Sequence, residues 1–316
     1  MNLLLAGELD AAERADWVAA LRLALPDHRL CLARGEVADA SIGAAIVANP
    51  APGSLAGLSG LRLIQSLWAG VDRLLTDPTL PAEVPLARMV DPAMNSAMAE
   101  TALWAALALQ RGFFEYARHQ QASRWQPHGQ RRADESPALV LGCGEMGRAV
   151  AGRLLQQGYP VSAWRRGAAA AAEAVPAGVR VLSGAPALFD ALAQAQILIN
   201  LLPLTPDTRG LIDARMLAAL PRGAGLVNLA RGAHLVEADL LAALASGQIG
   251  HAVLDVFQVE PLPAGHAFWL HPQVTVLPHA AAMTDVRSAA AVVAGNLEAL
   301  AAGLPLRHLV ARDTGY

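Results

Sequence analysis

Short hydrophobic runs alternate with amphipathic helical patterns along most of the chain, which is typical of βαβ units and parallel sheets. Hydrophobic residues at helical spacing over 10–25 separate the first two runs. The runs predicted as strands in the first third are NLLLAG (2–7), HRLCLA (28–33), AAIVAN (44–49) and LRLIQSLW (61–68). The pattern favours an α/β fold from the first residues onward.

A second series of the same kind begins after Pro137. Helical segments lie between most of its strands, and the alanine-rich run at 167–175 favours a helix over a linker. The predicted strands are ALVLG (138–142), YPVSAW (159–164), QILINLL (196–202), AGLVNLA (224–230), HAVLDVF (251–257) and QVTVLP (273–278). Two such series predict two Rossmann-like, doubly wound parallel-sheet domains, the first of them flavodoxin-like, with a cleft between them.

Two helical segments connect the series. Residues 92–121 are predicted to form one long helix, followed at 123–136 by a polar loop or arm marked by Pro and Gly. A last helix, at about 283–302, follows the final strand and returns the chain to the first domain. We therefore expect a discontinuous first domain of residues 1–92 and 283–316, and a second domain of residues 93–282.

The composition limits which cellular compartment and which partners are expected for the protein. Hydrophobic residues make up 54% of the chain, yet no run approaches the ~18 apolar residues of a spanning helix. The start, MNLLLAGELD, lacks a basic region and reaches Glu8 too early for a signal peptide. A net charge of −3 without a basic block argues against nucleic acid. Cys31 and Cys143 offer neither a disulfide framework nor zinc spacing, so we expect a cytoplasmic protein with no membrane partner.

The chain contains no lysine, and all 24 of its cationic residues are arginine. Schiff-base catalysis and the attachment of pyridoxal phosphate need a lysine amine, and so does a Walker-type phosphate loop. These classes of enzyme are therefore excluded.

A glycine-rich turn follows the first strand of the second series, in ALVLGCGEMGRAVAGRLLQQG. Gly142 permits a tight turn, Gly144 lets a pyrophosphate approach the backbone, and Gly147 allows the helix to pack closely on the strand. The helix N-terminus adds unpaired N–H groups, so a dinucleotide is the expected ligand. Within the loop, Cys143 is either a small filler or a redox-active thiol. The loop also contains Glu145 and Met146.

Two arginines end the next strand. An acidic residue that holds the ribose hydroxyls of NAD usually stands there, but here Arg165 and Arg166 follow Trp164, with no carboxylate before Glu173. A carboxylate would repel a 2′-phosphate, whereas arginine offers it a planar cationic fork. The pair therefore indicates NADPH (NADP⁺), with NADH as the weaker alternative. The competing interpretation is two solvated surface arginines.

Three later residues sit where predicted strands end: Arg231 after GLVNLA, Glu260 after HAVLDVF and His279 after QVTVLP. Ligands bind outside the carboxyl ends of the strands in open α/β sheets, so these residues can face one crevice. Singly, they can be a surface arginine, a loop glutamate and a capping histidine. Together they supply an anion binder, a carboxylate that orients an imidazole, and an acid–base group. That set suits hydride transfer to a 2-oxo acid, which needs a proton donor for the developing alkoxide.

At these residues the chain resembles the D-isomer-specific 2-hydroxyacid dehydrogenases, and within them the glyoxylate/hydroxypyruvate reductase branch. The resemblance covers nearly the whole chain, and the spacing of the three residues agrees with the family pattern. The segments that carry it are GCGEMG to AWRR (142–166), NLLPLT to EPLP (200–263), LPHAA (277–281) and SLWAGVDRLL (66–75).

The resemblance implies roles for these residues. Arg231 is expected to bind the substrate carboxylate and polarise the 2-oxo group, while His279 donates the proton. Glu260 is expected to hold the other imidazole nitrogen and raise its pKa. No metal is needed, because Arg231 and His279 provide the electrophilic assistance. The carboxylate is also expected to bind the backbone N–H groups of Trp68, Ala69 and Gly70 in the first, substrate-binding domain.

The resemblance also implies cofactor contacts beyond the phosphate loop, Trp164 and the two arginines. Asp255 is expected to accept a hydrogen bond from the nicotinamide carboxamide, and Thr208 to lie near the pyrophosphate. The remaining contacts are Leu202, Pro203, Leu229, Ala230, Arg231, His279 and Ala281.

The contacts of two residues are left undetermined by the resemblance. Thr101 stands where many family members have a histidine, which leaves the local hydrogen bonding undetermined. Trp125 lies in a segment that resembles the arm packing across the dimer in this family, so we expect a homodimer in which Trp125 reaches the partner subunit near its substrate cleft. The alternative is burial of Trp125 against its own subunit.

The predicted activity is NADPH-dependent reduction of glyoxylate, hydroxypyruvate or a bulkier 2-oxo acid. A cofactor-sensing corepressor on the same fold keeps the same residues and stays an alternative. β-Hydroxyacid dehydrogenases and imine reductases carry their phosphate loop at the start of the chain, and the former use a catalytic lysine. Phosphoglycerate and formate dehydrogenases fit less well, because the acidic NAD pattern is missing here.

Overall fold

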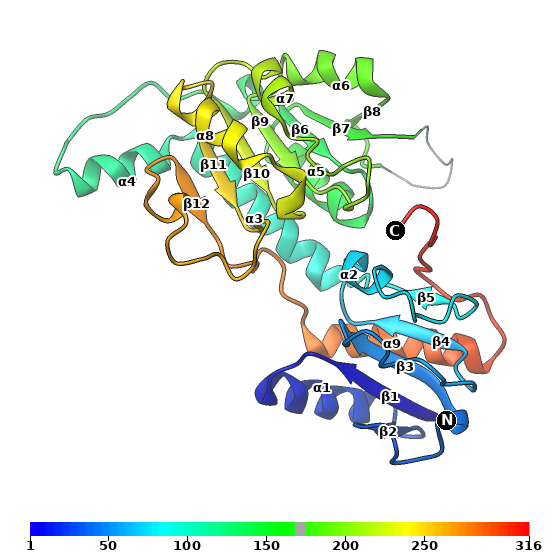
Figure 1. The fold of residues 1–316 in the computed structure, drawn as a ribbon. Helices are drawn as coiled ribbons and strands as arrows, with labels where there is room; N and C mark the ends of the chain where they lie inside the picture. The colour runs from blue at the N-terminus through cyan, green and yellow to red at the C-terminus, as the bar shows by residue number, and fades with distance from the viewer. Residues whose placement is uncertain (168–174, 316) are drawn as a thin grey trace. The chain divides into compact units, whose positions relative to one another are not determined.

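A computed structural model describes residues 1–167 and 175–315. The chain divides into two compact units, Met1–Met94 with Thr284–Tyr316, and Asn95–Met283 (Figure 1). The chain therefore passes between the units twice, once within a helix and once before the last one. The helix expected at 167–175 lies almost wholly outside the described residues.

The first unit contains a parallel five-stranded sheet in the order β2-β1-β3-β4-β5. This is the flavodoxin-like order, which confirms the expected fold of this part. Helix α9 packs against α1. The elements are β1 (Asn2–Gly7), α1 (Ala11–Ala24), β2 (Arg29–Cys31), η1 (Asp39–Ser41), β3 (Ile42–Ala48), β4 (Leu63–Ser66), α2 (Asp72–Leu75), β5 (Leu86–Ala87) and α9 (Val286–Ala301).

The second unit contains a parallel seven-stranded sheet in the order β12-β11-β10-β9-β6-β7-β8, which is the dinucleotide-binding order. Helix α3 (Pro92–Gln110) leads into it. The other elements are α4 (Phe113–Gln121), η2 (Ala133–Glu135), β6 (Ala138–Leu141), α5 (Glu145–Gln156), β7 (Val161–Arg165), β8 (Arg180–Ser183), α6 (Ala185–Leu192), β9 (Ile197–Asn200), α7 (Ala214–Ala219), β10 (Ala224–Asn228), η3 (Gly232–His234), α8 (Glu237–Ala245), β11 (Ile249–Leu254), η4 (Ala267–Leu270) and β12 (Val274–Val276).

The single helix expected over 92–121 is wrong, because the chain breaks it into α3 and α4 at Arg111 and Gly112. Gly112 has a φ of +66°, in the left-handed region that only glycine adopts readily. Its N–H still bonds the Leu109 carbonyl, which ends α3 before α4 begins.

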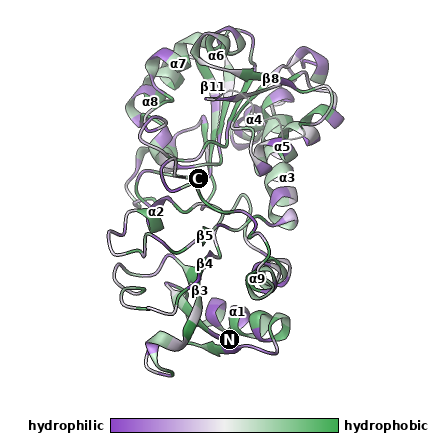
Figure 2. Cartoon of the chain, turned by 90° about the vertical axis from the view of Figure 1, so that its right-hand side faces the viewer, coloured by the Kyte–Doolittle hydropathy of each residue, from purple (hydrophilic) through white to green (hydrophobic). Residues whose placement is uncertain are grey.

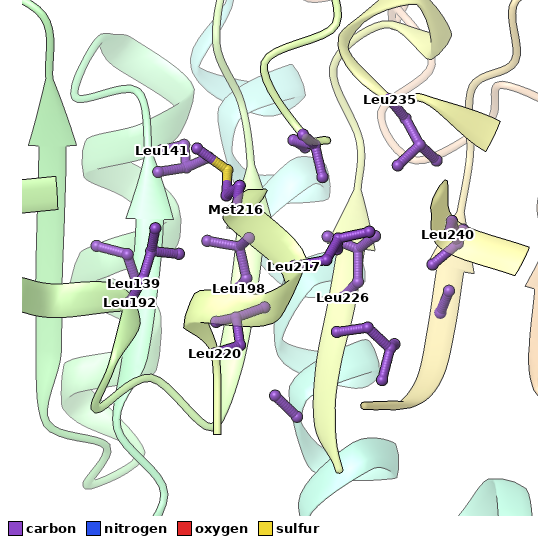
Figure 3. Packing of buried hydrophobic residues seen from close by; sticks show 14 of the residues in the cluster. Leu139, Leu141, Leu192, Leu198, Met216, Leu217, Leu220, Leu226, Leu235 and Leu240 are labelled. Carbon is purple, nitrogen blue, oxygen red and sulfur yellow. The ribbon is translucent and has the colours of Figure 1, made fainter. Parts of the chain in front are cut away.

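The core of the second unit lies on both faces of its sheet. Along β6, Leu139 and Leu141 face one hydrophobic cluster, and Ala138 and Val140 face the other. Helices α6, α7 and α8 cover the first face, and α3 and α5 cover the second. Figure 3 shows the first face, where leucines of β6, β9 and β10 meet those of α6 and α7. Burial on both faces explains why these strands are continuous hydrophobic runs.

The first unit follows the same rule, and all seven residues of β3 are buried. In contrast, its helices have one buried face each, with Trp17 and Leu21 buried on α1 and Val293 and Leu297 on α9. Figure 2 accordingly shows hydrophilic and hydrophobic colours side by side along the helices. No helix within residues 1–167 and 175–315 is long and apolar enough to cross a membrane.

Candidate active site

The strand order of the second sheet reverses between β6 and β9, and open α/β sheets bind ligands at such a point. Gly142, directly after β6, has a φ of +100°, and Gly144 caps the N-terminus of α5. A Cβ on Gly147 would lie 2.0 Å from the Gly142 carbonyl oxygen, so only glycine permits this approach. A Cβ on Gly144 would meet no described atom within 4 Å, which leaves this backbone open to a ligand.

The two arginines at the end of β7 have different surroundings. The Gly142 N–H donates to the carbonyl of Trp164, the residue before the two arginines, so the backbone that leads into them lies beside the glycine turn. Nε of Arg165 is buried and has no hydrogen-bond partner among the described residues. Arg166 forms an ion pair with Asp207, whose side chain is 75% exposed. A buried guanidinium nitrogen without a partner fits an anionic group of the cofactor at this edge.

His279 and Glu260 form a hydrogen-bonded pair. Nδ1 of His279 lies 2.7 Å from Oε2 of Glu260, while Oε1 of Glu260 accepts from the Phe257 N–H at 2.9 Å. An ionised carboxylate only accepts, so Nδ1 carries a proton and Nε2 is left to exchange one with a substrate.

The pair shifts both pKa values. The hydrogen bond to Glu260 raises the pKa of His279; the charges of Glu260 and Asp255 add to this, and burial and Arg231 oppose it. Burial raises the pKa of Glu260, but the hydrogen bonds from His279 and Phe257 and the charges of His279 and Arg231 lower it below its usual range. Glu260 is therefore ionised at neutral pH, and His279 stays protonated to a higher pH than a free imidazole.

Arg231 lies between β10 and η3 and is partly buried. Its Nη1 donates to the Ala230 carbonyl at 2.7 Å. A Cβ on Gly232 would lie 1.9 Å from the Phe257 carbonyl carbon, so the backbone after Arg231 packs directly on the segment that leads to Glu260. The structure thus brings Arg231, Glu260 and His279 near one another after β10, β11 and β12.

The turn that carries His279 is held by Asp255. His279 has a φ of +54°, a left-handed conformation that costs a non-glycine residue roughly 1–2 kcal/mol. Its N–H bonds the Asp255 carbonyl at 2.9 Å, and the Asp255 carboxylate accepts from Ala280 N–H at 2.7 Å and Ala281 N–H at 3.1 Å. Because both carboxylate oxygens are engaged and the side chain is 1% exposed, its contact with the nicotinamide carboxamide stays a prediction.

A buried polar network not singled out in the sequence supports Arg231. Nδ2 of Asn200 lies 2.9 Å from Oδ1 of Asn228 and 3.0 Å from Nδ1 of His234, and His234 Nε2 lies 3.2 Å from the Pro203 carbonyl. Asn228 donates to the Arg231 carbonyl at 3.1 Å. The two asparagines end neighbouring strands and pair in register, which is the signal that could have revealed them.

Several predicted cofactor contacts have buried side chains with partners inside the protein. The Trp164 indole donates to the Gly184 carbonyl at 2.9 Å, and the Thr208 hydroxyl donates to the Pro203 carbonyl at 2.8 Å. The cofactor contacts of Trp164 and Thr208 therefore stay predictions. The small or apolar contacts that are equally buried are Cys143, Leu202, Leu229, Ala230 and Ala281. Glu145, at the start of α5, pairs with Arg148, and Met146 is partly buried.

In the first unit, the predicted substrate loop follows β4. The Trp68 N–H is donated to Oγ of Ser66 at 3.0 Å, and the Trp68 carbonyl accepts from the Met89 N–H at 3.0 Å. Within the described chain, the N–H groups of Ala69 and Gly70 make no hydrogen bond, so they are the two that remain available to a carboxylate.

Trp125 lies in the segment after α4 and is 100% exposed. Figure 1 shows this segment reaching away from the rest of its unit before the chain returns to β6. Burial of Trp125 against its own subunit, the alternative left open above, is therefore not what the structure has.

Comparison with known proteins agrees with this geometry. The family described as "D-isomer specific 2-hydroxyacid dehydrogenase, NAD binding domain" matches residues 103–281. A glyoxylate/hydroxypyruvate reductase A from Serratia proteamaculans is 40% identical over 307 residues, which cover 95% of this chain and 96% of that protein.

Two solved structures are similar over the whole chain. One is a D-isomer-specific 2-hydroxyacid dehydrogenase from Xanthobacter autotrophicus in complex with NADPH and MES. It has a TM-score of 0.92 at 38% identity, and the match covers 100% of this chain and 99% of that chain. An NADPH-dependent glyoxylate/hydroxypyruvate reductase from Sinorhizobium meliloti, in complex with NADP and sulfate, has a TM-score of 0.90 at 33% identity, with coverage of 100% and 99%.

Proposed function

The chain belongs to the D-isomer-specific 2-hydroxyacid dehydrogenases, and we propose that it reduces small 2-oxo acids, with glyoxylate and hydroxypyruvate as substrates and NADPH as cofactor. The observation that carries this proposal is the His279–Glu260 pair beside Arg231 at the carboxyl ends of a dinucleotide-binding sheet. A reductase of this kind needs one group that binds the carboxylate and one that gives a proton to the carbonyl oxygen, and the three residues supply both.

Each residue has one task in the proposed mechanism. NADPH, when bound, supplies the hydride that reaches the carbonyl carbon. The Arg231 guanidinium binds the substrate carboxylate and draws electron density from the 2-oxo group. His279 gives the proton on Nε2 to the carbonyl oxygen as negative charge develops there. Glu260 keeps the ring oriented through Nδ1 and stabilises the charged form.

The residues at the phosphate end fit NADPH. The open backbone at Gly144 and the N-terminus of α5 suit the pyrophosphate. Arg165, with its unpartnered Nε, and Arg166 suit the 2′-phosphate, for which Arg166 would exchange its exposed partner Asp207.

Changing both Arg165 and Arg166 to alanine is expected to raise the KM for NADPH about 10- to 150-fold, because a charge-assisted hydrogen bond is worth about 1.5–3 kcal/mol. The KM for NADH should hardly change. The matched control is Arg180→Ala, an exposed arginine at the opposite end of neighbouring β8. If the KM values for NADPH and NADH rise equally in the double variant, the two arginines are surface charges only.

Steady-state turnover with a panel of 2-oxo acids, each with NADPH and NADH, tests the function as a whole. Rapid oxidation of NADPH in the presence of glyoxylate or hydroxypyruvate is the expected result. Tight NADPH binding without turnover of any 2-oxo acid would instead identify the cofactor-sensing alternative.

The proposal includes a homodimer in which Trp125 packs on the partner subunit. The support is an indole that is 100% exposed on a projecting segment, since so large an apolar ring is seldom left in water. Light scattering should give twice the chain mass, and Trp125→Ala should shift the equilibrium toward single chains. The control Trp269→Ala, which removes another exposed tryptophan, should not do so. A single-chain mass for the wild type would contradict the dimer.

A cytoplasmic location is the last part of the proposal. Cys31 and Cys143 are both buried, and no disulfide joins them. Such thiols are usual in a reducing compartment.

A further inference from the structure

Thr101, on α3, contacts the turn that carries His279. Its Oγ1 donates to the Ala281 carbonyl at 2.7 Å, although 180 residues separate the two in the sequence. The N–H of the same Ala281 bonds the Asp255 carboxylate at 3.1 Å. Ala281 is therefore held at both of its backbone polar groups, two residues after His279.

The turn needs these contacts because the left-handed backbone of His279 is unfavourable and its side chain is packed only in part. In the described parts of the chain, only three other non-glycine residues have a positive φ: Asn49, Ser123 and His308. The His279 side chain is 49% exposed, so packing does not fix the ring. Its direction depends on the Glu260 hydrogen bond and on the path of the backbone. The contacts that hold that backbone therefore act together with Glu260 to set where Nε2 points.

We propose that Thr101 is a positioning residue for His279, whose hydroxyl, through the Ala281 carbonyl, keeps the turn in the conformation that delivers the proton. The proposal rests on the proposed function of His279. Asp255 holds the N–H side of the turn from the end of β11, and Thr101 holds the carbonyl side from α3. Without the hydroxyl, the Asp255 bonds remain, and the turn can rotate about them.

The surroundings of Thr101 allow the hydroxyl to be removed without disturbing α3. Valine replaces the hydroxyl with a methyl group of similar size. A methyl group cannot stay at the 2.7 Å that the hydroxyl keeps from the Ala281 carbonyl oxygen, but the contact borders a pocket of about 390 Å³ into which the side chain can shift. The pocket is lined by Glu100, Thr101, Trp104, Leu277, Ala280 and Ala281. Thr101→Val therefore removes one hydrogen bond and requires only a small local shift of the side chain.

Thr101→Val is expected to lower kcat about 3- to 10-fold, the effect of one neutral hydrogen bond. The KM for NADPH should stay unchanged. A looser turn also weakens the His279–Glu260 hydrogen bond, so the high-pH limb of the kcat profile should move to lower pH. Arg231 and Asp255, the other charged groups that act on His279, are the same in the variant. Thr101→Ser, which restores the hydroxyl, should return kcat and the limb to near the wild-type values.

The matched control is Thr275→Val, which removes another partly buried threonine hydroxyl, bonded to His251 at 2.9 Å, from the same unit. It should leave kcat and the limb unchanged. A wild-type kcat and pH limb in Thr101→Val would overturn the proposal. A lower kcat that comes with a lower Tm and a higher KM for NADPH would also overturn it, because it would indicate a general structural defect. If the wild type turns over no 2-oxo acid, NMR titration of the His279 ring still decides: an unchanged pKa in Thr101→Val refutes the positioning role.

Discussion

The His279→Gln variant is expected to reduce glyoxylate with a kcat lowered roughly 10²–10⁴-fold, the usual contribution of a general acid. Glutamine keeps much of the shape and can still bond Glu260, but it has no proton to release. The affinity for NADPH, measured by fluorescence titration, should change little because the cofactor phosphates are proposed to bind at the glycine turn. Near-normal turnover would remove His279 from the mechanism.

The pH dependence gives a second measure of the same residue. The proposed reduction requires protonated His279, and Glu260 raises the pKa of its ring, so activity should fall as pH rises through a value above that of a free imidazole. Glu260→Gln removes the largest cause of this shift, and the limb should move to lower pH. A limb that stays in place would show that another group titrates.

The Arg231→Gln variant is expected to lose about 30- to 5,000-fold in kcat/KM for the 2-oxo acid, since removing one partner of a desolvated, hydrogen-bonded charge pair costs about 2–5 kcal/mol. Both KM and kcat should suffer, because the guanidinium is proposed to bind the carboxylate and to polarise the carbonyl. Arg231→Lys should recover only part of this, because an ammonium lacks the planar fork.

The variants at Arg231 and Glu260 are distinguished by the pH dependence of their activity. Arg231 lowers the pKa of His279, so its loss should move the high-pH limb upward, opposite to the effect of Glu260→Gln. A variant at Arg231 with unchanged kcat/KM, or with a limb that moves downward, would contradict its placement beside His279 and the substrate.

The strands that the sequence predicted well are those buried on both faces, such as β3 and β6, because they appear as continuous hydrophobic runs. Two strands were missed for the opposite reason. Strand β8 is an edge strand in which three of four residues are exposed, and β5 has only two residues. The break between α3 and α4 depends on one glycine, which helical periodicity does not register.

The candidate site shows a similar division. Arg231, Glu260 and His279 could be predicted because each follows a strand and their spacing matches a family. His234 could not, since a fully buried histidine with polar partners has the same letter as a surface one. The pairing of Arg166 with Asp207 spans 41 residues and depends on how two loops meet, which no local pattern encodes.

The discontinuity of the first unit has a consequence for the order in which the chain acquires its structure during synthesis. Residues 95–283 are continuous and contain a whole sheet with helices on both faces, so this unit can fold as soon as it has emerged. The first unit cannot, although its strands are made first. Its core needs Val293 and Leu297, and the buried amide of Gln65 on β4 is bonded by Asn296 of α9. We therefore expect the nascent N-terminal strands to stay incompletely packed, and to be the part of the protein most dependent on chaperones, until α9 has emerged.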